Sequence, residues 1–450
     1  MGDNRTQDGL KRRLGLFELT TTGIGIIVGA GIYVIIGKAA GMAGGAVWAS
    51  FLLGALAATF TGLSYAELSS RYPRAAASYE YTRRAFGKRA GFATGWLILF
   101  ATIIASSAVS IGFAGYLTSF VDVPVVPVAI GLVLLSGAVL IIGVREAVWV
   151  GVLFTLLEVG GLVVVIGFSA AHFGEGEYLE IPAGLLDVFR AATLLFFAYT
   201  GFEQLATLSE EAKNPKKMMP LAIIGAIGVT TVLYVLVGFS AVSVLDWQVL
   251  SGSSAPLADV VESAANVSIA RAIGYIALFA TANTALFLLL TGSRMLYGMS
   301  RCGSLPGVLG RVLKSRGTPW VATLVAVGLA IVFVLPGDIE VVAQMTNFAT
   351  IAAFALVNAA LVWVRLSKPR EEGGFRIPLN VRGVPVTAVA GVIIAILMLA
   401  TMDWQVLGYG LLILALGIGL PFVMERLKII LPPDVQPDEA VEKEPSVPGG

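Results

Sequence analysis

The chain has 450 residues, of which 57% are hydrophobic and 13% charged, with a formal net charge of +1. A soluble protein carries roughly 25% charged residues, so this composition excludes an ordinary soluble domain. One cysteine and one histidine exclude an intramolecular disulfide and metal sites built from these residues. The sequence has no phosphate-binding loop and no nucleophile–histidine pair, so we expect no catalytic residues, no metal site and no cofactor.

The apolar residues fall into twelve runs of about 20 residues, the length that an α-helix needs to cross a bilayer. We therefore predict an all-α polytopic membrane protein with twelve transmembrane helices. The runs start near Leu14, Ala46, Gly91, Val125, Val148, Phe189, Leu221, Ile269, Pro319, Val341, Val384 and Gln405.

The basic residues are distributed unequally between alternate loops. Loops on the side of the amino terminus hold most of the lysines and arginines, whereas the opposite loops keep only Lys38, Arg190 and Arg271. Because cytoplasmic loops carry the excess of positive charge, we expect a multi-pass protein of the plasma membrane with both termini in the cytoplasm.

The first apolar run contains the sequence GIGIIVGAGIY at residues 23–33. Each of its glycines, at positions 23, 25, 29 and 31, weakens a helix interior by about 1 kcal/mol relative to alanine. Interrupted backbone is tolerated in a membrane only where it lines a cavity enclosed by protein. The pattern therefore predicts an interrupted helix that contains a ligand site.

The fifth run carries Glu158 among apolar residues. A carboxylate at that depth costs at least ~2.5 kcal/mol, so an intramembrane acid is a functional candidate. The alternative is a buried acid, neutral or paired, that only locks helices together.

The sixth run reads FFAYTGFEQ at residues 196–204, where a glycine among polar residues again interrupts a membrane helix. Glu203 is placed to cap or orient this break. Interrupted first and sixth helices indicate two five-helix halves of opposite orientation, with the substrate between them near the bilayer midplane.

These observations divide the chain into five parts. We expect a cytoplasmic tail over residues 1–13, a first inverted repeat over 14–170 and a second over 171–366. Two further helices occupy 367–431. The proline- and acid-rich segment 432–450 is predicted to be a disordered cytoplasmic tail.

The eighth run places Ala280, Asn283 and Thr284 on one helical face. Their side-chain and backbone oxygens could bind a small cation. Hydrogen bonding between helices explains the same residues equally well.

A broken helix presents amide donors at the start of one half and carbonyl acceptors at the end of the other. The donors favour an anionic group and the carbonyls favour a cation. A site that offers both suits a zwitterion with neighbouring carboxylate and ammonium groups, and an α-amino acid fits that description.

Four stretches resemble the amino acid–polyamine–organocation (APC) superfamily of permeases, and most closely its prokaryotic cationic amino acid transporter-like members. They are GIIVGAGIY at residues 25–33, YAEL at 65–68 with the loop through residue 79, and the segments 196–220 and 292–306. The resemblance implies a leucine-transporter-like fold, in which a 5+5 inverted repeat is followed by two additional helices.

The resemblance also implies a substrate site at the two breaks. It places the substrate carboxylate at the amides of Gly29, Ala30 and Gly31, and Phe202 beside the substrate as a gate. It places the ammonium at main-chain carbonyls that flank the breaks: Ile26 or Ile27, with Phe196, Ala198 and Tyr199.

Glu158 stands where several members of this superfamily have a lysine, so the lysine mechanism does not transfer directly. We interpret Glu158 as the coupling group. Facing the carbonyls of Gly25 and Val28, with Asn283 and Thr284 nearby, it would hold a proton or complete a sodium site. We favour the proton, because a carboxyl group in apolar surroundings retains its proton more readily.

The sequence thus predicts a secondary active transporter that imports an α-amino acid by alternating access, without an obligatory protein partner and without nucleic acid. An amino acid or amine exchanger that uses no ion gradient is an alternative. A sensor that binds an amino acid without transporting it is another. The sequence leaves open which amino acid is bound and the oligomeric state.

Overall fold

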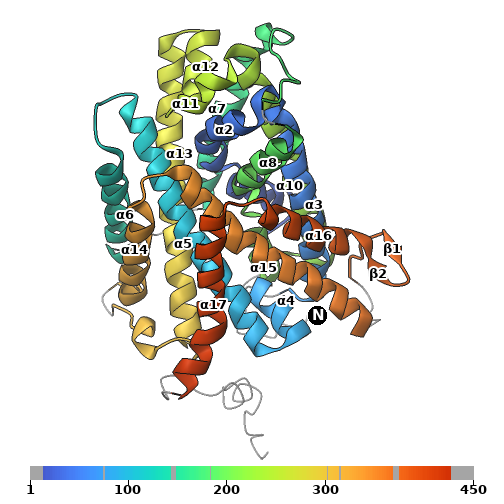
Figure 1. Cartoon of the computed structure of the whole chain (residues 1–450). Coiled ribbons are helices and arrows are strands. Elements are labelled where there is room, and N and C mark those ends of the chain that lie inside the picture. The colour runs from blue at the N-terminus through green and yellow to red at the C-terminus, as the bar shows by residue number, and fades with distance from the viewer. Residues whose placement is uncertain are drawn as a thin grey trace, which may run out of the picture.

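The computed structural model describes residues 14–73, 77–142, 148–182, 184–301, 303–313, 316–367 and 374–426. The predicted tails over 1–13 and 432–450 lie outside the described residues. Helices dominate this part of the chain (Figure 1), and its one hairpin pairs β1 (Asn380–Val381) with β2 (Val384–Pro385) in antiparallel register.

Both predicted interruptions are present. The first apolar run folds as α1 (Leu16–Val28) and α2 (Gly31–Ala43), separated at Gly29 and Ala30. The sixth folds as α8 (Leu185–Tyr199) and α9 (Phe202–Thr207), separated at Thr200 and Gly201. Gly201 has a φ angle of +120°, which a residue with a side chain rarely adopts.

Each of the other ten apolar runs folds as one uninterrupted helix. Among the described residues, nine helical segments are long and apolar enough to cross a bilayer, whereas α1, α14 and α16 are apolar but shorter. The chain is therefore an all-α multi-pass membrane protein. The helices formed by these ten runs are α3 (Val47–Arg71), α5 (Lys88–Thr118), α6 (Val125–Ile142), α7 (Val148–Ser169), α10 (Pro215–Val244), α13 (Val267–Arg301), α14 (Trp320–Val334), α15 (Ile339–Ser367), α16 (Val386–Ala400) and α17 (Trp404–Arg426).

Short helices lie at the two ends of the bundle (Figure 1). One end carries α4 (Ala77–Phe86), and we name it the α4 face; the other carries α11 (Trp247–Gly252) and α12 (Pro256–Ala264), and we name it the α12 face. Short 3₁₀ turns occupy Gly44–Ala46, Ala170–His172, Leu208–Glu210 and Gly307–Gly310.

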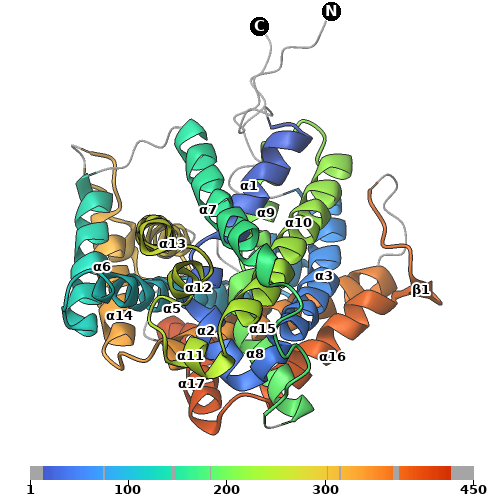
Figure 2. The same ribbon diagram turned by 90° about the horizontal axis from the view of Figure 1, so that it is seen from above.

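The long helices pack in two groups (Figure 2). In one group, α3 packs on α10 and α8, and α1 packs on α10 and α7. In the other, α5 packs on α13 and α14, and α6 packs on α14. Helix α15 contacts both groups, through α5 on one side and through α8 and α3 on the other.

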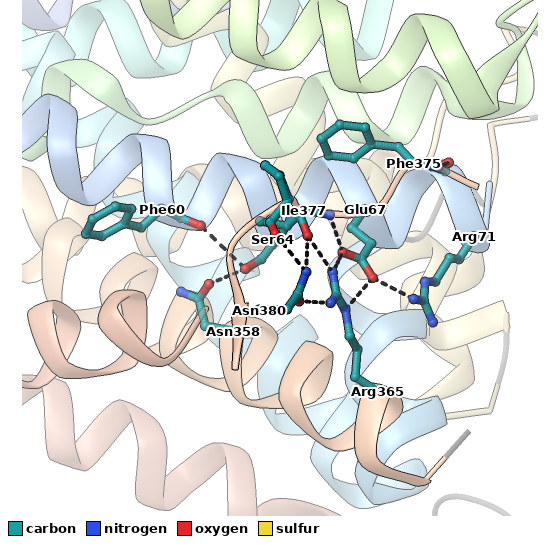
Figure 3. A network of polar contacts seen from close by, with 11 residues as sticks. Phe60, Ser64, Glu67, Arg71, Asn358, Arg365, Phe375, Ile377 and Asn380 are labelled. Atoms are coloured by element: carbon teal, nitrogen blue, oxygen red, sulfur yellow. Dashed lines mark hydrogen bonds and ion pairs between the residues drawn. The ribbon is translucent and has the colours of Figure 1, made fainter. Parts of the chain in front are cut away.

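A buried ion pair joins α3 to α15 near the α4 face (Figure 3). The Arg365 guanidinium donates two hydrogen bonds to the Glu67 carboxylate, the Nε–Oε1 bond being 2.8 Å long. Both side chains are almost fully buried. Arg71 pairs with the same carboxylate at 2.6 Å, and the Ile377 amide donates to it at 3.0 Å. The segment that follows α15 is therefore fastened to α3.

A second polar contact lies further along the same interface. Ser64 donates to the Asn358 amide oxygen at 2.6 Å, and the Asn358 Nδ2 donates to the Thr61 hydroxyl at 3.0 Å. All three side chains are buried. Polar side chains therefore hold α15 against α3 over two successive stretches.

Replacing Glu67 with glutamine should destabilise the protein strongly. Glu67→Gln leaves the buried Arg365 cation without its carboxylate, and breaking such a pair costs about 3–5 kcal/mol. We expect a clear fall in the melting temperature of the purified protein in detergent. The exposed Glu175 gives the matched control, Glu175→Gln, and equal melting temperatures for the two variants would contradict this prediction.

Candidate functional site

The two breaks lie against each other. A Cβ atom on Gly31 would lie 2.8 Å from the Cα of Ala198, and one on Gly201 would lie 2.9 Å from the Ile26 carbonyl oxygen. Real Cβ atoms do not approach backbone this closely, so both positions require glycine. The main chain of α1 and α2 therefore meets the main chain of α8 and α9 at the level where both helices are interrupted.

Tyr234 of α10 bridges the two breaks. Its hydroxyl oxygen lies 2.8 Å from the Ile27 carbonyl oxygen and 3.0 Å from that of Ala198, and it acts as the donor. These are carbonyls near the ends of α1 and α8, where helices leave acceptors unpaired. Two of the carbonyls predicted to meet an ammonium group are thus brought to one buried hydroxyl.

Glu158 of α7 lies near the first break, where its main-chain carbonyl accepts a hydrogen bond from Tyr33. The Asn283 side chain is placed to hydrogen-bond the Glu158 carboxyl. The Oε1 atom of Glu158 is buried and has no partner among the residues that the structure describes. The Thr284 hydroxyl accepts from the Ala30 amide at 3.3 Å. Glu158, Asn283 and Thr284 therefore lie near the first break.

Two tyrosines, one from α2 and one from α5, hold this arrangement. The Tyr33 hydroxyl of α2 donates to the main-chain carbonyl of Glu158 at 2.5 Å, and Tyr116 of α5 donates to the Tyr33 carbonyl at 2.8 Å. Thr155, one turn before Glu158, faces Gly25 so closely that a Cβ there would clash with it. The position of Glu158 relative to α1 is thus determined by contacts on both sides of the break.

Phe202 lies in an aromatic cluster between the breaks and the α4 face. Its ring centroid is 5.1 Å from that of Phe354 and 5.8 Å from that of Tyr65. Tyr81 of α4 packs edge-on against Tyr65 at 5.9 Å, and Phe196 packs on Phe354 at 6.0 Å. Phe202, which is predicted to be a gate, is therefore fully buried and has aromatic rings as neighbours.

Glu203 accepts a hydrogen bond from the Gly201 amide at 2.8 Å. This contact gives a main-chain donor within the second break a partner. It also ties the Glu203 side chain to the residue that precedes α9. The capping role expected for Glu203 is thus present.

The structure brings together most of the predicted site residues. Ile27, Val28, Gly29 and Ala30 are buried at the first break, whereas Gly25, Ile26 and Gly31 are only partly buried. Phe196, Ala198, Tyr199 and Phe202 are buried at the second break. The Phe196 side chain turns toward α15 rather than toward the first break.

Sequence reasoning missed Tyr234, Tyr33 and Tyr116. Each is a single tyrosine in an otherwise apolar stretch, and nothing in that pattern distinguishes a tyrosine that caps a broken helix from one that packs in a core. The signal lies only in the partner carbonyl, which belongs to another helix.

Comparison with known proteins decides the family. The profile of the family described as "Amino acid permease" matches residues 18–416. The chain belongs to the amino acid permease family. The permease is thus a member of the APC superfamily, as the sequence motifs indicated, and it is a transporter rather than an enzyme.

Several curated relatives cover most of the permease. It is 30% identical over 439 residues to the branched-chain amino acid permease BcaP of Bacillus subtilis, with 93% of this chain and 94% of BcaP aligned. It is 31% identical to the methylthioribose transporter of the same organism, over 82% of this chain and 84% of that protein. Cationic amino acid transporter 4 of Homo sapiens is 30% identical, over 81% of this chain and 62% of its own length.

Adding a methyl group at the second break should impair the permease. Gly201→Ala forces alanine into an unfavourable backbone conformation, at about 1–3 kcal/mol, and drives its Cβ into the Ile26 carbonyl. We expect substrate affinity to fall on the order of tenfold or more, as measured from initial uptake rates. Gly228→Ala, on an open face of α10, is the matched control, and a Gly201→Ala variant with equal uptake would contradict the assignment.

Proposed function

We propose that this permease is a secondary active transporter that imports an α-amino acid by alternating access. The observation that carries the proposal is the contact between two interrupted helices. Their freed main-chain groups provide amide donors beside Ala30 and carbonyl acceptors at Ile27 and Ala198. This pairing of donor and acceptor groups at a helix interruption suits the carboxylate and ammonium of one small zwitterion.

The proposed substrate contacts follow from these groups. The amides of Gly29, Ala30 and Gly31 bind the carboxylate, and the carbonyls of Ile26 or Ile27 and of Ala198 bind the ammonium. The names of the branched-chain permease and of cationic amino acid transporter 4 support an amino acid. The methylthioribose relative makes that compound a necessary member of the substrate screen.

The proposed architecture is twelve spans with a leucine-transporter-like arrangement. Residues 14–170 and 171–366 form oppositely oriented halves, and each half begins with a broken helix. The segment 367–431 adds two helices. The α4 face is cytoplasmic in this proposal, because the arginine-rich loops lie on that side.

Alternating access requires the contacts around the breaks to change. Gly31 and Ala198 lie too close for a ligand to pass between them, and Phe202 is closed in by Tyr65 and Phe354. A substrate therefore enters only when α2 and α8 part on the α12 face, and leaves when the aromatic cluster opens toward the α4 face. Rocking of one helix group on the other would produce both movements.

Purified protein tests the function directly. We expect at least one of the twenty amino acids to raise the melting temperature, since a ligand stabilises the folded state that it binds. The same amino acid, radiolabelled, should accumulate in proteoliposomes when an ion gradient is imposed. Uptake that occurs only against a preloaded amino acid would indicate an exchanger, and binding without uptake a sensor. A shift with methylthioribose alone would overturn the proposed substrate class.

We further propose that Glu158 couples transport to the proton gradient, or completes a sodium site with Gly25, Val28, Asn283 and Thr284. Glu158 is 3% exposed, and its Oε1 atom has no hydrogen-bond partner in the described part of the chain. An acid in this position must take up a proton or a cation to be stable in an apolar environment.

Glu158→Gln should abolish the response of uptake to the imposed gradient. Glutamine keeps the size and the hydrogen bond with Asn283 but can neither release a proton nor attract a cation. We expect uptake driven by a proton or sodium gradient to fall to the level without a gradient. Glu262→Gln, at an exposed site on α12, is the control. A mutant that still responds to either gradient as the wild type does would contradict the coupling role.

A further inference from the structure

A polar cavity lies away from the breaks, on the α12 face. Its volume is about 180 Å³, and it opens between the ends of α2, α8 and α15 and the turn that joins α16 to α17. One water needs about 10–15 Å³ of such space, so the cavity can hold several waters or one small organic ion. Its polar lining comprises Asp187, Arg190, Thr193, Gln344, Thr401 and Asp403.

The lining offers groups of both charge signs. Arg190 Nη1 donates to Asp187 Oδ1 at 3.0 Å, and the Arg190 side chain remains 48% exposed. A guanidinium has five donors in a planar fork, so the others can bind a carboxylate. The Asp403 carboxylate makes no hydrogen bond or ion pair within the described ranges, and it is exposed. The cavity thus presents free guanidinium donors of Arg190 and the unpaired carboxylate of Asp403.

The rim of the cavity has an excess of acid. Glu340 interacts electrostatically with Asp338, Lys38 and Asp403, and it accepts a hydrogen bond from the cavity-lining Gln344 at 3.3 Å. The opening is therefore surrounded by four carboxylates (Asp187, Asp338, Glu340 and Asp403) and two cations (Lys38 and Arg190). Such a field concentrates ammonium-bearing solutes, while Arg190 selects those that also carry a carboxylate.

Asn347 lies one turn along α15 from Gln344 and contacts the main chain of the cavity-lining Thr193. Its Nδ2 donates to the carbonyls of Thr193 at 2.7 Å and Leu194 at 3.1 Å. Its Oδ1 is buried and unpaired within the part of the chain that the structure describes. From Thr193, α8 continues for about 9 Å to its break at Tyr199. The cavity is therefore bordered by a stretch of α8 that is held to α15 and that leads to the second break.

We propose that this cavity is a second amino acid site, an antechamber that holds the zwitterion before it reaches the breaks. The ligand carboxylate binds Arg190, and its ammonium binds Asp403. The inference rests on the proposed function, since it takes the same class of ligand, and on the orientation that places the α12 face outside. Parting of α2 from α8, which both line the cavity, then passes the ligand inward.

Equilibrium binding to the full-length protein tests the antechamber. The probe is the tritiated form of whichever standard amino acid gives the largest rise in melting temperature. We expect two equivalents per wild-type chain, and one equivalent in the double variant Arg190→Gln/Asp403→Asn. Gly201→Ala should also retain one equivalent at its wild-type affinity, because it weakens only the site at the breaks. The amide of the same amino acid, which lacks the carboxylate, should not compete at the equivalent that Gly201→Ala retains.

The control is Arg271→Gln/Asp122→Asn, which makes the same two substitutions at exposed positions away from the cavity. It should bind two equivalents. If wild type and Arg190→Gln/Asp403→Asn bind the same number of equivalents with the same affinity, the antechamber is refuted while the proposed transport function stands. If none of the standard amino acids binds the wild type, the proposed function itself fails and the antechamber fails with it.

Discussion

The rest of the structure depends on one constraint: main-chain groups freed inside a membrane protein must find partners within the protein. Interrupting α1/α2 and α8/α9 frees such groups at two places. Tyr234 donates to the carbonyls of Ile27 and Ala198, Thr284 accepts from the Ala30 amide, and Glu203 accepts from the Gly201 amide. Two helices besides the broken ones, α10 and α13, are thereby held at the breaks.

The groups that satisfy the broken helices leave capacity for a ligand. A carbonyl oxygen has two lone pairs, so Ile27 and Ala198 can each accept from Tyr234 and from one further donor. Glu158 reaches the same region from α7, where Tyr33 holds its main chain. A small ligand at the breaks and an ion at Glu158 would therefore act on one set of helix ends, which gives a physical route for coupling one to the other.

Helix α15 is fastened to the group that contains the breaks at several levels. Asn347 holds it to α8 near the α12 face, Asn358 meets Ser64 of α3 further along, and Arg365 pairs with Glu67 near the α4 face. Because α15 also packs on α5, it is one of the elements that join the two helix groups. Movement of one group on the other must rearrange these polar contacts or carry α15 with it.

The sequence alone determined the membrane class and the positions of both interruptions. Glycines and polar residues inside an apolar run favour an interrupted helix, and a membrane tolerates one only where protein encloses the freed main-chain groups. It also placed Glu158, Asn283 and Thr284 together, through the family resemblance. Only the tertiary structure decided that Tyr234 bridges the breaks, that Arg365 pairs with Glu67 across 298 residues, and that a polar cavity lies beside Asn347. Those pairings depend on which helices lie side by side, and the period of an apolar helix does not specify its neighbours.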